Sequence, residues 1–185
     1  MLSNRVYNTL DSNRTNANNV VSWDGLTGSA ISWHQVFGVS YKKTGKWYFE
    51  VKKTTGGSAH VGVGLADRYF FLTWDNKSIA YVYNGPNGAK AFSGDPNWQT
   101  DETYGATYSV GDVIGVAVDF DGGTLTFYKN GVSQGIAYTN LSGKELTPFA
   151  AMGNSDTWVA SEFNFGQKPF GFPVPDGYNP GWYDE

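Results

Sequence analysis

The sequence contains no cysteine, which excludes disulfide bonds, cysteine-ligated zinc and thiol nucleophiles. Charged residues make up only 16% of the chain, and the formal net charge is −4 without any basic stripe. A nucleic-acid partner is therefore not expected. No apolar run approaches the roughly 18 residues that a membrane-spanning helix needs. The first residues also lack the hydrophobic segment of a secretory signal.

Aromatic residues and glycines are abundant. Aromatics make up 17% of the 185 residues, and there are 24 glycines. A weakly charged composition of this kind favours strands joined by tight turns, whereas disordered chains carry more charge and fewer aromatics. The length suits one domain with a buried core.

Several runs alternate between apolar and other side chains, which is typical of strands with one buried face. In residues 46–53 the alternation places Trp47, Phe49 and Val51 on one face. The opposite face carries Tyr48, Glu50 and Lys52. The same period of two recurs in residues 59–66, 112–120 and 124–129.

Two turn signals separate the later runs. The first is D-G-G at residues 121–123, where Asp121 is expected to cap the turn by bonding nearby backbone. The second is N-G at residues 130–131, the strongest two-residue hairpin signal because both positions need a positive φ. Residues 112–138 are therefore predicted to form a three-stranded antiparallel meander.

Further strands are expected near residues 19–23, 31–40, 79–83, 90–93, 147–152 and 157–165. About ten to thirteen short strands without a long crossover helix predict an all-β fold of two packed antiparallel sheets. An exposed sheet edge could pair with a second copy, but no residue indicates the oligomeric state.

One motif suggests catalysis. The letters G-V-S-Q-G around Ser133 fit the G-x-S-x-G pattern of serine hydrolases, whose serine sits on a turn between a strand and a helix. Here the following residues resemble a strand, and both histidines, His34 and His60, precede the serine rather than follow it. Ser133 is predicted to be a strand residue. Without neighbouring ligands, neither histidine supports a metal site.

A two-sheet sandwich could still carry a glycosidase, which needs two carboxyl groups about 5–10 Å apart. Neither Glu50 nor Glu162 has a second carboxylate two residues away on its own predicted strand. Such a pair would have to come from distant strands. Glycoside hydrolysis is therefore the less favoured alternative, and the expectation is a protein that is not an enzyme and has no cofactor.

Several fragments, in order, resemble the SPRY domain. They are GKWYFEV, VGVGLAD, YNGPNGAKAFSG, YSVGDVIGVAVDFDGGTLTFYKNGVSQG and FNFGQKPFGF, and the resemblance covers about residues 19–178. It implies one SPRY-like domain over residues 1–185, with an extended tail at 173–185. The implied fold is a bent β-sandwich related to concanavalin-type lectins. The implied function is non-catalytic binding of peptides or protein surfaces through edge loops.

The phrasing D-G-G-T-L-T-F-Y-K-N-G-V-S-Q-G and the ending N-F-G-Q-K-P-F are most similar to SPRY domains in structural proteins of tailed bacteriophages. That similarity implies a virion location and a receptor-binding role, for example on a tail fibre, with a host-surface glycan or protein as ligand. The alternative is a structural or decoration role in which the same surface contacts other virion proteins.

Aromatic side chains outside the predicted core are the candidate binding residues. Strand aromatics such as Phe49 and Phe127 are expected to fold the protein. Loop aromatics offer apolar area at low entropy cost, and neighbouring polar groups can fix a ligand's orientation. The candidates are Arg68, Tyr69, Phe70, Trp74, Asp95, Trp98, Asp156 and Trp158.

Overall fold

The computed structural model describes residues 4–32, 34–56, 61–67, 79–93, 102–153 and 156–185. Its strands are β1 Val6–Tyr7, β2 Asn19–Val21, β3 Thr27–Ala30, β4 His34–Phe37, β5 Lys46–Lys53, β6 Val61–Ala66, β7 Ala80–Asn84, β8 Ala89–Ser93, β9 Glu102–Thr103, β10 Val113–Asp119, β11 Thr124–Lys129, β12 Val132–Tyr138, β13 Thr147–Met152, β14 Val159–Asn164, β15 Asn179–Pro180 and β16 Tyr183–Asp184. One short 3₁₀ helix, η1, covers Ser12–Arg14. Within these residues, no helix has the length and apolar character needed to cross a bilayer.

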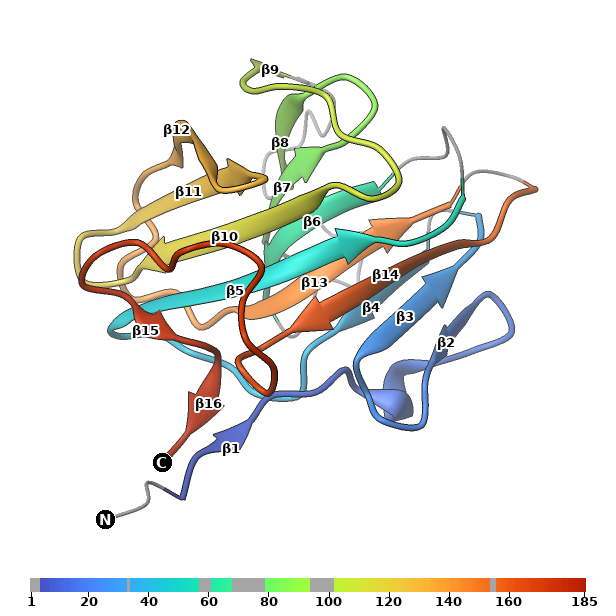
Figure 1. Ribbon diagram of the computed structural model, residues 1–185, viewed down its shortest axis with the longest axis horizontal. Coiled ribbons are helices and arrows are strands. Elements are labelled where there is room, and N and C mark those ends of the chain that lie inside the picture. The colour runs from blue at the N-terminus through green and yellow to red at the C-terminus, as the bar shows by residue number, and fades with distance from the viewer. Residues whose placement is uncertain (1–3, 33, 57–60, 68–78, 94–101, 154–155) are drawn as a thin grey trace.

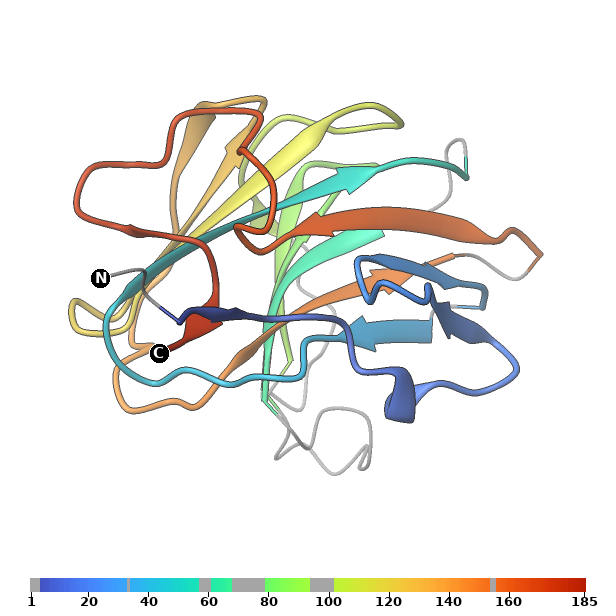
Figure 2. The ribbon, with the colours of Figure 1, turned by 60° about the horizontal axis from the view of Figure 1, so that its bottom comes forward.

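Two antiparallel sheets lie against each other, as Figures 1 and 2 show. The larger sheet has the order β12-β11-β10-β5-β14-β3-β2, and β15 adds to β5 in parallel. The smaller sheet has the order β4-β13-β6-β7-β8-β9. The predicted all-β, two-layer antiparallel sandwich is therefore confirmed.

The core fills the space between the sheets with alternate side chains of each strand. Phe49 and Val51 come from β5 and Phe127 from β11, while Val63 and Leu65 come from β6. Each of these side chains is at most 1% exposed. The period of two seen in the sequence thus identifies the inward faces correctly.

The meander predicted at residues 112–138 is present as β10, β11 and β12. Its second turn has φ values of 48° at Asn130 and 79° at Gly131, as the N-G signal requires. Among the strands longer than two residues, β3 was not predicted, because its sequence T-G-S-A has too few large apolar residues to be recognised as a strand. The two-residue strands β1, β9, β15 and β16 were not predicted either. Trp23, expected within a strand, instead lies in the turn after β2.

The outward face of β5 departs from the simple alternation. Tyr48 and Glu50 are only 1% and 4% exposed, because the segment after β14 folds over them. The Phe170 ring packs edge-on against Tyr48 at 5.1 Å, and the Gly171 amide donates to Glu50 at 2.8 Å. The tail, expected to be extended or coiled, therefore acts as a cover and ends in β16, which pairs with β1 beside the N-terminus (Figure 1).

Candidate functional site

Two of the eight predicted binding residues, Asp156 and Trp158, are described by the structure. Both are exposed, and Trp158 retains 44% of its accessible surface. They lie in the loop between β13 and β14. The other six lie outside the described residues, so their role stays a prediction: Arg68, Tyr69, Phe70, Trp74, Asp95 and Trp98.

The backbone on both sides of Trp158 fits closely against neighbouring loops. Gly153 has φ 97°, and a Cβ there would lie 2.8 Å from the Cα of Ile31, which follows β3. Gly56, after β5, has φ 98°, and its Cβ would lie 2.6 Å from Cγ2 of Val159. Only glycine allows such approaches without strain. The ends of β3, β5 and β13 and the start of β14 therefore form a single rim, here called the Trp158 rim.

Hydrogen bonds fix the start of β14 to the end of β5. The amide and the hydroxyl of Thr54 both donate to the carbonyl oxygen of Ala160, at 3.0 and 3.1 Å. The Ala160 amide donates to the hydroxyl of Thr55 at 3.1 Å. Val159, between Ala160 and Trp158, is fully buried. The exposed indole thus sits beside an anchored strand, which lowers the entropy lost when a ligand binds it.

His34, at the start of β4, lies beside this rim and supports its structure. Its Nδ1 is 2.9 Å from the Ile31 carbonyl oxygen, and its Nε2 is 3.3 Å from Nδ2 of Asn18. The described part of the chain contains no group of three His, Cys, Asp or Glu side chains that could hold a metal ion. His60 lies outside the described residues.

The strand register separates the predicted loops into two groups. Thr147 at the start of β13 pairs with Ala66 at the end of β6. The loop that carries Trp158 and the chain after Ala66 therefore leave the smaller sheet at opposite ends. Ala66 also pairs with Ala80, and Ala80 pairs with Ser93. The strand ends that precede the other two predicted loops, Ala66 and Ser93, therefore lie together at that second end of the sheet.

Ser133 lies within β12, as predicted from the residues that follow it. Its hydroxyl accepts a hydrogen bond from the Gly135 amide at 3.2 Å. His34 is on β4, and β12 and β4 lie at opposite sides of the sandwich, since β4 contacts β2 at the far edge of the larger sheet. The turn between strand and helix that a nucleophilic serine needs is absent at this position.

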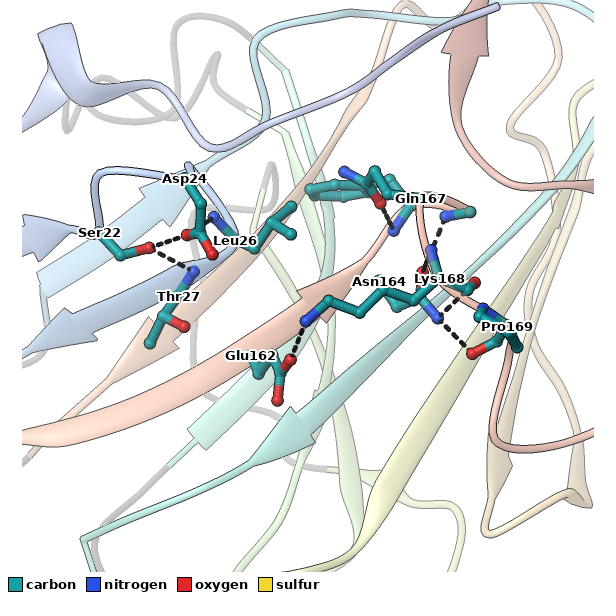
Figure 3. A network of polar contacts seen from close by, with 11 residues as sticks. Ser22, Asp24, Leu26, Thr27, Glu162, Asn164, Gln167, Lys168 and Pro169 are labelled. Carbon is teal, nitrogen blue, oxygen red and sulfur yellow. Dashed lines mark hydrogen bonds and ion pairs between the residues drawn. The ribbon is translucent and has the colours of Figure 1, made fainter.

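The glycosidase alternative requires an open pair of carboxylates. Glu50 and Glu162 do come from adjacent strands, because Asn164 of β14 pairs with Glu50 and places Glu162 diagonal to it. Glu50, however, is covered and accepts bonds from two tail amides, at 2.8 and 3.1 Å. Glu162 is engaged by the Lys168 ammonium at 2.6 Å (Figure 3). This pair does not face a substrate cleft.

Trp23 is an exposed aromatic outside the eight predicted binding residues. Its side chain is 103% exposed in the turn between β2 and β3. The signal in the sequence was the D-G pair at residues 24–25, a turn signature directly after the tryptophan. Placing Trp23 on a strand hid this signal.

Comparison with known proteins identifies relatives. The family model described as SPRY domain matches residues 46–168. The Ran-binding proteins 9/10 homologue of Drosophila melanogaster is 39% identical over 133 residues, covering 69% of this chain and 13% of that protein. Ran-binding protein 9 of Xenopus tropicalis and of Homo sapiens are each 36% identical over 71% of this chain, which covers 23% and 18% of their lengths.

Solved structures agree with the fold. The SPRY domain of human HERC1 superposes with a TM-score of 0.67 at 17% identity, covering 86% of this chain and 99% of that one. The TRIM65 PSpry domain gives a TM-score of 0.59 at 17% identity, over 85% and 92% of the two chains. The predicted SPRY resemblance is confirmed by these findings.

The predicted bacteriophage setting is wrong. The relatives are animal Ran-binding proteins, so the virion location, the tail-fibre role, virion partners and a host-surface glycan ligand are not supported. The longer phrase that suggested a phage protein spans residues 121–135 and forms the turn after β10, strand β11, the next turn and the first four residues of β12. Those residues satisfy the geometry of a meander, and they therefore reflect the fold rather than the source of the protein.

Proposed function

Because the chain belongs to the SPRY domain family, we propose that it is a non-catalytic module that binds a segment of a partner protein at the Trp158 rim. The observation that carries this proposal is the half-exposed indole of Trp158 on a backbone held by Gly153, Gly56 and Thr54. Tryptophan is enriched among residues that dominate binding energy, and a fixed indole binds at low entropy cost. Asp156 supplies an exposed carboxylate two residues away.

Ran is one candidate partner, since the relatives are named as Ran-binding proteins. This chain spans only 13–23% of their lengths, so their partner could be bound by other parts of those proteins. A test therefore needs both Ran and an unbiased source of protein segments. A displayed library of random peptides provides the second.

The test selects peptides on the wild-type chain and measures the affinity of selected peptides, and of Ran, by calorimetry. Replacing Trp158 with alanine is expected to weaken binding about tenfold or more, because it removes the central apolar contact. The thermal midpoint should stay the same, since the side chain is exposed. Val132, 65% exposed on β12, provides a matched control: V132A should bind as the wild type does.

Two results would contradict the proposal. One is that neither the library nor Ran gives saturable binding. The other is that W158A and V132A bind selected ligands equally well, which would place the contact surface elsewhere on the domain.

A further inference from the structure

The turn between β2 and β3 is held by an internal network of hydrogen bonds (Figure 3). Ser22 accepts from the Gly25 amide through its carbonyl at 2.9 Å and from the Thr27 amide through its hydroxyl at 2.9 Å. The same hydroxyl donates to Oδ1 of Asp24 at 2.5 Å, and that oxygen also accepts from the Leu26 amide at 3.0 Å. The turn is therefore fixed by its polar residues.

Packing against the N-terminal segment adds to this rigidity. Gly25 has φ 70°, and a Cβ there would lie 2.8 Å from Cβ of Thr9. The Gly25 carbonyl accepts from the Leu10 amide at 2.7 Å. Since Leu10 is buried in the main core, the turn is anchored to the body of the domain.

Trp23 alone among the turn residues has no structural role. It makes no hydrogen bond or ring contact with the described residues, and its whole side chain is exposed. Folding an indole onto apolar surface would stabilise the chain. A rigid turn that instead holds it in solvent presents an aromatic face and an indole N–H ready for a partner.

The charge beside the indole is negative. The Ser22 hydroxyl, then the Leu26 amide, and also the charge of Lys168, lower the pKa of Asp24 below its ordinary value and so stabilise its ionised form. Oδ2 of Asp24 accepts no hydrogen bond from the described residues, whereas Oδ1 accepts two. The Lys168 ammonium is itself bound to Glu162 at 2.6 Å. One carboxylate oxygen therefore remains open to a cation next to the indole.

We propose that Trp23 and Asp24 form a second contact site, which takes an arginine side chain from an exposed segment of a partner protein. A guanidinium can stack on an indole face and donate to a carboxylate at the same time. Lysine matches the charge but lacks the planar stacking surface. The site does not depend on the Trp158 rim, because it lies on a different turn and uses other residues.

The test uses the ¹⁵N-labelled full chain and a ten-residue peptide of glycine and serine with one central arginine. The Trp23 indole N–H resonance is identified by its absence from W23F, and the other six tryptophans serve as internal references. We expect a saturable shift of the Trp23 resonance alone. The same peptide with citrulline, which keeps the shape but lacks the charge, should bind about tenfold more weakly.

Variants make the result specific. D24N keeps an acceptor at Oδ1 for the turn but removes the charge, so it should weaken arginine binding several-fold while the Leu26 and Thr27 amide resonances stay in place. K168M removes a competing cation and should tighten binding. W158A should bind the arginine peptide as the wild type does, even if the Trp158 rim is found to bind no partner.

Three outcomes would overturn the proposal. The arginine and citrulline peptides could shift the Trp23 resonance equally. D24N could bind with unchanged affinity. Alternatively, the Trp23 resonance could move with protein concentration when no peptide is present, which would assign the site to a second copy of the chain.

Discussion

Asp119, at the end of β10, is a carboxylate whose charge supports the fold. Its Oδ1 accepts from the Gly122 amide at 2.7 Å, and its Oδ2 lies 2.9 Å from the Lys46 ammonium. Burial alone would raise the pKa of Asp119, but the Gly122 amide and Lys46 outweigh it and lower the pKa. A lowered folded-state pKa contributes stability that is present above the unfolded value of about 3.9 and is lost as the pH falls through the folded value.

We therefore expect the free energy of unfolding to drop as the pH falls from about 4 towards the lowered pKa of Asp119. D119N should be less stable at pH 7 by about 1–2 kcal/mol, since a charge-assisted bond becomes a neutral one. It should also lose less stability over the acidic range. Urea unfolding at a series of pH values measures both effects, with D176N in the exposed tail as control. Parallel acid profiles of D119N and the wild type would contradict this account.

Residue-level prediction from sequence succeeded where the partner is local and failed where it is distant. The positive φ at Asn130 and Gly131 follows from the N-G pair alone. Asp121, expected to cap its own turn, instead accepts from the Gly45 amide across the sheet, and Asp119 holds the turn. Trp23 is a partial exception: the D-G pair after it is a local sign of a turn, but nothing local shows whether an aromatic in a turn stays exposed or folds back onto the core.

At the scale of single elements, β12 shows how a side chain holds an irregular strand pair together. Its pairing with β11 shifts register twice between Leu125 and Tyr128. There the Tyr104 hydroxyl accepts from the Phe127 amide of β11 at 3.2 Å and donates to the Gly135 carbonyl of β12 at 2.6 Å. The Tyr104 side chain therefore bridges the two strands where their own hydrogen-bond ladder is interrupted.

Removing this bridge should destabilise the domain. Burial raises the pKa of Tyr104 to about 12, so its hydroxyl is protonated at neutral pH and donates to Gly135. In Y104F the Phe127 amide loses its acceptor and the Gly135 carbonyl loses its donor, and we expect the free energy of unfolding to fall by about 1–3 kcal/mol. Urea unfolding measures it, with K144M as control. A Y104F variant as stable as the wild type would show that the bridge does not hold the strand pair together.

For the whole molecule, the sequence predicted the two sheets better than it predicted the segment that covers the outer face of the larger sheet. Alternation gave the inward faces of β5, β10 and β11 because burial between sheets repeats every second residue. It did not reveal that Tyr48 and Glu50 are buried on the outer face, because the segment that covers them lies more than a hundred residues later. The same holds for the candidate site. The sequence identified Trp158 as a loop aromatic, but only the structure shows that Gly56 and Gly153 allow the neighbouring segments to pack closely around it.

The C-terminal segment contributes to the main core although the matched family region ends at residue 168. Trp182 is fully buried, with its ring 5.8 Å from Phe49 and 6.3 Å from Phe120. Its indole N–H donates to the Ser40 carbonyl at 3.1 Å, and its amide donates to Phe165 at 2.8 Å. The segment therefore joins core residues of the larger sheet to the N-terminal part of the chain, where the Asn8 amide donates to the Trp182 carbonyl at 2.8 Å.

A chain that ends at Lys168 should consequently fail to unfold cooperatively, because it leaves a space the size of a tryptophan in the core and uncovers Glu50. The milder change W182A should destabilise the full chain by about 3–5 kcal/mol, a large share of the roughly 5–15 kcal/mol typical of a domain. Guanidinium unfolding followed by circular dichroism measures both, and W158A at the exposed rim should shift the unfolding free energy by less than about 0.5 kcal/mol. A truncated chain with the midpoint and slope of the full chain would mean that the region matched by the family model folds without its cover.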